Sequence, residues 1–447
     1  ELIDYIVERK YPRFGTSGIR GIWGKDFTRR RIMFVVHAIC DLAEKMGLSG
    51  KPFVIGYDSR EHADEVAMWA AGVCLARGHE VLFSTRDSPT PALVYYGRKV
   101  LKSDIAGLLV ATASHNPAEW QGIKYYPPSC FPAPTDVTNW IGSRANLLQL
   151  THEGEPEFVD LEVAKEKVNY FDPMEDYCNW VLGKLRKDII RTRLKEKLIV
   201  VDEMHGAGRG YIRRILDTLG CRYVVVHGWR DPRFGNLLYA NPEDPFLTEC
   251  KEVVKQTGAI LGVALDADAD RFGIVDEYGR FITPHQVLMM LIDYLVHDRG
   301  WDGKIIRSFT TTTVIDEIVS GLSGILRPAV EEPIYIQHTF YSLKRGEHYL
   351  NRSPCFNTMV GIKYLAEAMT LNEWYQVDDK IDPETSFVIA GEESGGLTTF
   401  GHLPDKDGVW ANMLVIEMVA HRGKPPSEIW EEVREKYKIA ADFGRVD

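Results

Sequence analysis

Short apolar runs alternate with longer amphipathic stretches along most of the chain. The apolar runs have the length of buried strands and lie at 53–57, 105–111, 198–202, 260–265 and 387–390. Helical patterns occur at 29–45, 63–76 and 426–436. Strand and helix in alternation predict an α/β fold with mixed, mostly parallel sheets.

The length of 447 residues exceeds what one hydrophobic core organises, and it implies about three domains. A polar stretch with glycine and proline at 152–156 marks a first boundary. The segments 51–57, 197–202 and 304–308 each begin with lysine, continue as an apolar strand and end in a polar turn. We therefore expect three similar domains in tandem around a central cleft, followed by a linker. Their expected ranges are 1–153, 154–299 and 300–423, with the linker at 424–447.

Charge and cysteine usage narrow the class of protein. A net charge of -11 argues against nonspecific nucleic-acid binding, although a local cluster of cations can still hold an anionic substrate. The seven cysteines are scattered without a Cys-x-x-Cys pair, which favours reduced thiols. No apolar run approaches the roughly 18 residues that span a bilayer. The first four residues lack a basic signal-peptide start. We expect a cytoplasmic protein without nucleic-acid or membrane partners, and the sequence leaves its oligomeric state open.

A candidate nucleophile follows the apolar run 105–111. Ser114 lies in Thr112-Ala113-Ser114-His115-Asn116-Pro117, where strand gives way to loop. A serine hydroxyl is a weak nucleophile until a base or a metal activates it, and His115 is its neighbour. Asn116 and Pro117 would make the turn rigid. The alternative is an ordinary strand-to-loop turn with a capping serine.

Three aspartates follow the apolar run 260–265. In an extended chain Asp266, Asp268 and Asp270 would face one side, where three like charges repel unless a cation neutralises them. Oxygen ligands without histidine or cysteine suit Mg²⁺. The alternative is a solvated acidic turn, and an Asp-x-Asp also begins the nucleophile loop of haloacid-dehalogenase-like phosphatases.

Three further sites carry polar groups suited to a sugar phosphate. Glu392 and Ser394, after the run 387–390, can bond neighbouring sugar hydroxyls, or they can cap a helix. Lys124 lies on the segment leaving Ser114, where it could stabilise phosphoryl charge or act as an acid or base; the alternative is a surface lysine. Arg271 offers a two-pronged donor for phosphate.

Four segments of the chain, in their order along the sequence, resemble motifs of the α-D-phosphohexomutases, a family that includes phosphoglucomutase, phosphomannomutase and phosphoglucosamine mutase. The similar segments are Phe14-Gly15-Thr16-Ser17-Gly18-Ile19-Arg20-Gly21, then 112–124, 266–271 and 391–396. The segment Thr358-Met359-Val360-Gly361-Ile362-Lys363 resembles a third-domain loop that faces the cleft in that family.

The resemblance implies a role for each candidate residue. Ser114 would carry a phosphoryl group, with Arg20, Lys124 and His115 beside it. One Mg²⁺ per chain would be held by an oxygen of Ser114 together with Asp266, Asp268 and Asp270. Substrate would be bound by Glu392, Ser394, Arg271 and Lys363.

The implied reaction is reversible phosphoryl transfer between positions 1 and 6 of a hexose phosphate. It passes through a hexose 1,6-bisphosphate, which also serves as activator. Glucose is the expected sugar because Glu392-Glu393-Ser394 and Asp405-Lys406-Asp407-Gly408-Val409 look closer to phosphoglucomutases. The alternatives are a phosphomannomutase or phosphoglucosamine mutase, a sugar-bisphosphate synthase or phosphatase, and a non-catalytic sugar-phosphate-binding homologue.

The sequence departs from the family pattern in two places. The family's fourth domain carries an Arg-x-Ser-Gly-Thr loop that grips the non-reacting phosphate, and no such motif occurs here. We therefore expect this chain to lack that domain. The segment 337–354 also fits the family pattern poorly.

Overall fold

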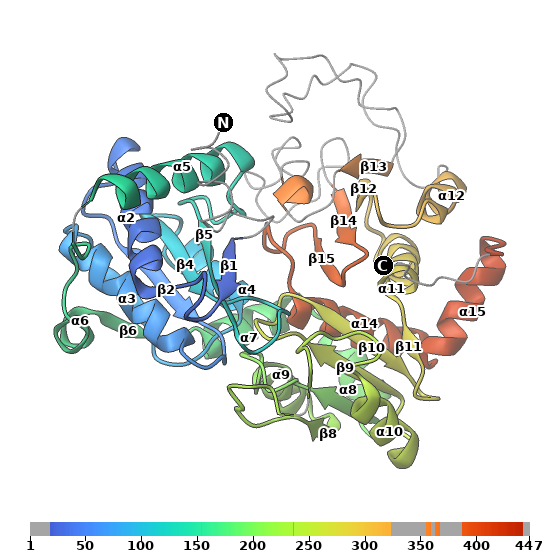
Figure 1. Ribbon diagram of the computed structural model, residues 1–447. Coiled ribbons are helices and arrows are strands. Elements are labelled where there is room, and N and C mark those ends of the chain that lie inside the picture. The colour runs from blue at the N-terminus through green and yellow to red at the C-terminus, as the bar shows by residue number, and fades with distance from the viewer. Residues whose placement is uncertain are drawn as a thin grey trace, which may run out of the picture.

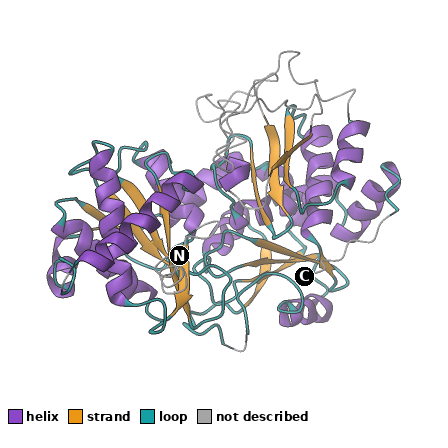
Figure 2. Cartoon of the chain, turned by 45° about the horizontal axis from the view of Figure 1, so that its top comes forward, coloured by secondary structure: helices purple, strands orange, loops and turns teal. Residues whose placement is uncertain are grey.

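The computed structural model describes residues 18–152, 154–235, 237–322, 355–358, 363–366 and 387–440. Within them, three mixed sheets follow one another along the chain, each flanked by helices (Figure 1, Figure 2). This arrangement confirms the predicted α/β fold in tandem units. No helix in the described ranges has both the length and the apolar character needed to cross a bilayer.

The first sheet has six strands in the order β1-β5-β4-β2-β3-β6, and only β5 runs against its neighbours. Its strands are β1 (Ile19–Ile22), β2 (Phe53–Tyr57), β3 (Val81–Ser84), β4 (Gly107–Ala111), β5 (Trp120–Tyr126) and β6 (Asn169–Phe171). The central strands β2 and β4 are buried almost throughout, which explains their continuous apolar sequences. The helices of this unit are α2 (Arg29–Lys45), α3 (Ala63–Ala76), α4 (Thr90–Tyr95), η1 (Tyr96–Val100), α5 (Thr135–Thr151) and α6 (Leu161–Lys167).

Strand β6 corrects the expected first boundary. It pairs with β3 in parallel, and the preceding helix α6 packs against α3. The chain therefore stays with the first sheet beyond residue 153, as far as Phe171. The polar stretch at 152–156 is a connection between α5 and α6 within this unit.

The second sheet has five strands in the order β11-β10-β9-β7-β8, with β7, β8 and β9 parallel. Its strands are β7 (Leu198–Asp202), β8 (Arg222–Val226), β9 (Leu261–Leu265), β10 (Phe272–Asp276) and β11 (Phe281–Ile282). The helices between β6 and β10 are α7 (Met174–Lys184), α8 (Lys187–Leu194), α9 (Tyr211–Leu219) and α10 (Thr248–Thr257).

The third sheet has four strands in the order β13-β12-β14-β15, and β15 runs antiparallel to β14. Its strands are β12 (Lys304–Ser308), β13 (Cys355–Thr358), β14 (Phe387–Glu392) and β15 (Gly396–Thr399). The helices of this part are α11 (Pro284–Asp293), η2 (Tyr294–Asp298), α12 (Val314–Gly321), α14 (Gly408–Arg422) and α15 (Pro426–Lys436).

Helix α14 joins the second and third sheets. All its residues from Gly408 to Ala420 are buried, and it packs against α8, β9 and β10 on one side and β15 on the other. A helix with apolar residues on nearly all sides requires this double burial, and its buried polar residues Asn412 and Glu417 are hydrogen-bonded. The Asn412 side chain donates to the Ala264 carbonyl of β9 (2.8 Å), and Gly408 N donates to the Ala269 carbonyl (3.1 Å). The helix therefore fixes the loop after β9 relative to the third sheet.

Helix α15 corrects the expected linker at 424–447. Ile429 and Val433 are fully buried, and the helix packs against α11 and α14. The residues 426–436 thus belong to the core around the third sheet, because their apolar stripe is covered.

Replacing Ile429 with alanine should lower the free energy of unfolding by about 2 to 5 kcal/mol, because the cavity left in a packed core is filled incompletely. Urea unfolding followed by circular dichroism measures this change. Glu435→Ala, on the exposed side of the same helix, should change it by less than about 0.5 kcal/mol. Equal effects of the two substitutions would contradict the packing of α15.

Candidate active site

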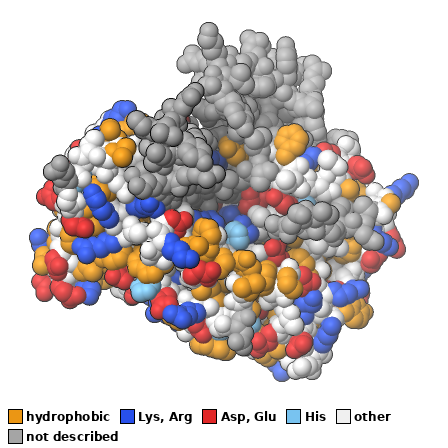
Figure 3. Space-filling model, viewed as in Figure 1, with side chains coloured by type: hydrophobic (Ala, Val, Ile, Leu, Met, Phe, Trp, Pro, Cys, Tyr) orange, Lys and Arg blue, Asp and Glu red, His pale blue; other side chains and the backbone are white. Residues whose placement is uncertain are grey.

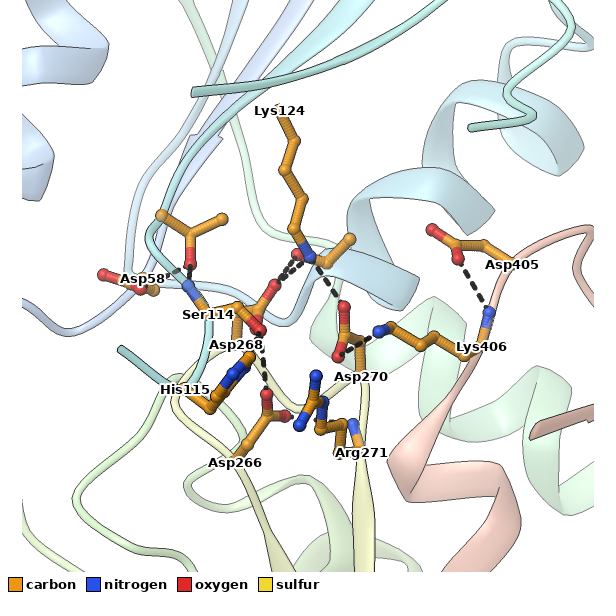
Figure 4. Close-up of polar contacts among 12 residues, drawn as sticks. Asp58, Ser114, His115, Lys124, Asp266, Asp268, Asp270, Arg271, Asp405 and Lys406 are labelled. Atoms are coloured by element: carbon orange, nitrogen blue, oxygen red, sulfur yellow. Dashed lines mark hydrogen bonds and ion pairs between the residues drawn. The ribbon is translucent and has the colours of Figure 1, made fainter. Parts of the chain in front are cut away.

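Three polar segments meet where β4, β9 and β14 end. Ser114 comes three residues after β4, Asp266 follows β9 directly, and Glu392 is the last residue of β14. Figure 4 shows Ser114, His115 and Lys124 from the first sheet facing the aspartates of the second. The carboxyl ends of strands in α/β sheets commonly hold binding sites, and here three sheets contribute.

Ser114 lies in a left-handed turn. Its φ is 53°, which a residue other than glycine adopts at a cost. The turn can approach β5 because Gly122 has no side chain: a Cβ there would collide with the carbonyl of Thr112. The buried Ser114 Oγ lies 3.2 Å from Asp266 Oδ2 and 3.4 Å from His115 Nδ1. The serine therefore faces both an imidazole and a carboxylate of another sheet.

The three aspartates converge, but not in the extended conformation that we expected. The segment 266–271 is a turn between β9 and the antiparallel β10, with Ala269 at φ 57° and a bond from Ala269 N to Asp266 O (3.1 Å). Because the chain folds back here, one oxygen from each of the three carboxylates lies within 4.8 Å of the others. Asp266, Asp268 and Asp270 are all buried.

Lys124 crosses from β5 to the aspartates. Its buried ammonium lies 2.6 Å from Asp268 Oδ2 and 2.6 Å from Asp270 Oδ2 (Figure 4). From the start of α4, Thr90 donates to Asp268 twice, from Oγ1 to Oδ2 (2.5 Å) and from its backbone N to the carbonyl (2.9 Å). The first sheet is thus bonded directly to the aspartate turn.

The carboxylates of Asp266 and Asp268 differ in their affinity for protons. Burial, and then the charges of Asp270 and Asp268, hold the pKa of Asp266 well above its usual range. Burial also opposes ionisation of Asp268, but the Lys124 ammonium outweighs it and lowers the pKa of Asp268. Lys124 itself is buried, yet Asp268 and Asp270 raise its pKa. One lysine therefore neutralises only part of the charge that three aspartates can carry.

The donor set suits a divalent cation. Among the described residues, buried Asp268 Oδ1 has no hydrogen-bond partner and buried Asp270 Oδ1 has only the Lys406 ammonium at 3.5 Å, whereas buried carboxylate oxygens are normally well bonded. All the available ligands are oxygens, which Mg²⁺ prefers. The three aspartates can therefore hold a metal ion.

Several cations surround the aspartate turn. Burial first, and then the charges of Arg271, Arg20 and Lys406, lower the pKa of His115. Arg20 Nη1 donates to Asn116 Oδ1 (2.7 Å). In the space-filling view of Figure 3, acidic and basic side chains gather around a histidine near the middle of the molecular face that is shown. Such a set of cations can balance the charge of a phosphate ester.

Glu392 and Ser394 lie together at the end of the third sheet. Ser394 Oγ donates to Glu392 Oε1 (2.7 Å), and Lys406 Nζ lies 3.4 Å from the same oxygen. Lys406 also lies 3.5 Å from Asp270 Oδ1, so it connects this end to the aspartate turn. The Asp405 carboxylate accepts from Lys406 N (2.8 Å) and Tyr126 Oη (2.6 Å), which fixes the lysine's backbone.

Lys363 is not joined to this group by any contact among the described residues. It is buried in a helical turn at 363–366, and its ammonium lies 5.0 Å from the Tyr364 ring centroid. The parts of the predicted motifs at 14–17 and 359–362, and the segment 337–354, lie outside the described residues.

A cavity of about 430 Å³ lies away from these residues. It is lined by aromatic and basic side chains, among them Trp180, Lys184, Arg299, Trp301 and Trp410, and by no predicted site residue. The convergence of charged groups, rather than the size of a cavity, therefore locates the candidate site.

Sequence reasoning gave no role to three residues that contact the site, namely Arg60, Thr90 and Lys406. Arg60 follows β2 and donates to the Ser114 carbonyl. Its position shortly after a buried strand next to β4 was a usable signal, since neighbouring parallel strands end at the same edge. Lys406 lies in the Asp405-to-Val409 motif that was used only for the sugar preference. Its contact with Asp270, like that of Thr90 with Asp268, arises from packing between sheets, which local periodicity does not encode.

Comparison with known proteins identifies the family of the chain. The chain matches three family models, described as phosphoglucomutase/phosphomannomutase alpha/beta/alpha domains I, II and III, at residues 12–150, 175–279 and 337–437. It is 27% identical over 434 residues to the phosphoglucomutase/phosphomannomutase of Thermococcus kodakarensis, covering 95% of this chain and 81% of the relative. It is 30% identical over 336 residues to the probable phosphoglucosamine mutase of Methanococcoides burtonii, covering 72% of this chain and 67% of the relative.

Solved structures show the same fold. A protein of Thermus thermophilus assigned as a phosphomannomutase superposes with a TM-score of 0.78 at 25% identity, covering 96% of this chain and 84% of that one. The phosphoglucomutase parafusin of Paramecium superposes with a TM-score of 0.73 at 21% identity, covering 96% of this chain and 75% of that one. On these matches, the chain belongs to the phosphoglucomutase/phosphomannomutase family, the α-D-phosphohexomutases, and is an isomerase.

Proposed function

We propose that the protein interconverts the 1- and 6-phosphates of a hexose, with glucose as the preferred sugar, through a phosphorylated Ser114. The observation that carries this proposal is the meeting of Ser114 Oγ with Asp266 Oδ2 at 3.2 Å, since the two belong to different sheets. A serine placed against a carboxylate triad suits phosphoryl transfer, in which positioning and charge stabilisation supply most of the rate.

In the first transfer, a free hydroxyl of the sugar takes the phosphoryl group from Ser114 Oγ. The bond between phosphorus and Ser114 Oγ breaks as the bond to the sugar oxygen forms, and the proton of the sugar hydroxyl ends on Ser114 Oγ. His115 Nδ1, 3.4 Å from Ser114 Oγ, lies where it can relay that proton. The product is a hexose 1,6-bisphosphate. This intermediate then reorients in the site and returns its other phosphoryl group to the serine.

Cationic side chains balance the charge of the phosphoryl group. Lys124, Arg20 and Arg271 are the proposed donors around it. Ser114, Asp266, Asp268 and Asp270 would hold one Mg²⁺, and the ion, when bound, supplies Lewis-acid neutralisation of phosphoryl charge. The burial of Ser114 keeps water from the phosphoserine, which limits its hydrolysis.

Glu392 and Ser394 are the proposed ligands of the sugar hydroxyls, with Lys406 beside Glu392. Lys363 is a further proposed substrate ligand on the basis of its motif. The glucose preference is supported by the Glu392-Glu393-Ser394 motif; the names of the relatives span phosphoglucomutase, phosphomannomutase and phosphoglucosamine mutase.

Turnover of glucose 1-phosphate, mannose 1-phosphate and glucosamine 1-phosphate tests the proposal, with Mg²⁺ and catalytic glucose 1,6-bisphosphate present. Glucose 1-phosphate should give the highest kcat/KM. A higher value for either other sugar would overturn the preference for glucose. Phosphate release without isomerisation would indicate a phosphatase, and binding without turnover would indicate a non-catalytic homologue.

Removal of divalent metal should lower turnover on the order of 10²-fold or more, because the aspartates would then repel the phosphoryl group. The measurement compares enzyme dialysed against a chelator with the same enzyme after Mg²⁺ is restored, and thermal unfolding of both samples confirms that the protein stays folded. Full activity of the metal-free protein would contradict the metal's role.

A further inference from the structure

A fully buried arginine lies behind the turn that holds Ser114. Arg60 follows β2, and its guanidinium donates to the main-chain carbonyls of Ser114, Asn116 (2.7 Å) and Pro117 (2.6 Å). Its Nε donates to Asp58 Oδ2 at 3.1 Å. One side chain therefore holds three carbonyls of the loop and a carboxylate, which suits a guanidinium with five N–H donors and exceeds the three donors of a lysine ammonium.

Asp58, the carboxylate that pairs with Arg60, also holds the amide N–H of Ser114, through the hydroxyl of Thr112. Ser114 N donates to Thr112 Oγ1 (2.8 Å), and Thr112 Oγ1 donates to Asp58 Oδ2 (2.6 Å). Asp58 thus fixes the N–H side of Ser114 and Arg60 fixes its carbonyl side. Since the left-handed conformation of Ser114 is unfavourable by itself, these bonds are what maintain it.

A residue of the second unit packs on Arg60. The Arg60 guanidinium carbon lies 4.9 Å from the ring centroid of Phe234, which is fully buried in the segment after β8. Beside this contact, Glu61 N donates to the Pro232 carbonyl at 3.1 Å. An aromatic face over a buried guanidinium is attractive and limits where that guanidinium can move.

The same segment supports the aspartate turn. Gly235 lies against His205, because a Cβ at Gly235 would stand only 2.9 Å from His205 Nε2. Next to His205, Gly206 packs on the turn: a Cβ there would stand 2.7 Å from the Asp266 carbonyl. Ala207 N donates to the Ala267 carbonyl at 2.7 Å. A continuous series of contacts therefore connects the Ser114 backbone to the Asp266 backbone. It passes through Arg60, Phe234 and its neighbour Gly235, and then through His205 and its neighbour Gly206.

We propose that Arg60 and Phe234 form a positioning pair that sets Ser114 Oγ against the aspartate turn, so that Phe234, on another unit, controls the geometry of phosphoryl transfer. The proposal rests on the proposed function. Neither side chain is a catalytic residue, because both act through the backbone of Ser114. A displacement of about 1 Å between reacting groups can cost up to about 10²-fold in rate, so a loosened pair should lower kcat.

Phe234→Leu is the main test, because it keeps an apolar side chain and removes the aromatic face. We expect kcat to fall about tenfold or more while KM for the hexose phosphate changes less than about twofold, since the sugar ligands lie on the third sheet. Arg60→Lys, which keeps the charge but not the fork, should lower kcat further. Phe246→Leu, at a partly buried phenylalanine that follows Phe234 in the same segment after β8, is the control and should leave kcat unchanged.

Hydrogen exchange of the peptide that contains Ser114 provides a second readout that does not depend on turnover. Phe234→Leu should speed exchange at 112–117, although Phe234 lies on another unit, and Phe246→Leu should not. Unchanged exchange, or equal losses of kcat and thermal stability in both phenylalanine variants, would overturn the positioning pair. If the unsubstituted chain has no turnover while exchange still responds to Phe234→Leu, the proposed function fails and the coupling stands.

Discussion

Replacing Ser114 with alanine is expected to lower mutase turnover on the order of 10⁶-fold, because the hydroxyl that would carry the phosphoryl group is removed. The same substitution should leave the fold intact. It removes two side-chain hydrogen bonds of Ser114 Oγ, one to Asp266 Oδ2 and a longer one to His115 Nδ1, and each such bond contributes about 1 kcal/mol to stability. Steady-state turnover and thermal unfolding of the same sample measure both effects.

Ser59→Ala is a matched control for this substitution. Ser59 is also fully buried, it lies in the same unit, and its hydroxyl has no hydrogen-bond partner in the part of the chain that the structure describes. Its removal should change neither turnover nor stability appreciably. A Ser114→Ala protein with the activity of the parent chain would exclude a phosphoserine mechanism at this position.

Asp268→Asn is expected to have the second largest effect, a loss of turnover of about 10²- to 10³-fold. Asparagine keeps the shape of the side chain but removes the charge that faces Lys124 at 2.6 Å, and it removes one anionic ligand of the proposed metal. Turnover measured against Mg²⁺ concentration should show half-saturation at a higher concentration than in the parent chain.

Asp244→Asn tests whether loss of any carboxylate in the second unit has this effect. Asp244 is exposed and pairs with Lys251 at 2.8 Å, and such surface pairs contribute little. Its turnover and Mg²⁺ dependence should equal those of the parent chain. An Asp268→Asn protein with an unaltered Mg²⁺ dependence would contradict the assignment of the aspartates to a metal.

The strands and the loops that follow them could be predicted because a buried strand is visible in the local sequence as a continuous apolar run. β2 and β7 were expected at the residues where they occur, since strands buried on both faces have continuous apolar sequences. The same pattern placed Ser114, Asp266 and Glu392 at strand ends. The conformation of the aspartate turn was not predictable from alternation, because the antiparallel return into β10 folds it back.

Features that depend on contacts between distant segments could not be predicted in this way. Strand β6 has three residues with only Phe171 buried, so it left no apolar run, and the first boundary was placed too early. Thr90 and Asp268 are 178 residues apart in sequence, and Arg60 meets Phe234 across two units. Such contacts arise from the packing of sheets against one another, which local periodicity does not encode.

The most direct test of the account is the location of the transferred phosphoryl group. Folded, Mg²⁺-loaded protein is treated with a phosphatase, exposed to glucose 1,6-bisphosphate, and examined by intact mass and peptide mass spectrometry. We expect the mass of one phosphoryl group to be gained, to lie on Ser114, and to be lost again when excess glucose 6-phosphate is added. A protein that isomerises hexose phosphates with Ser114 unmodified, or with the phosphoryl group on another residue, would contradict the account.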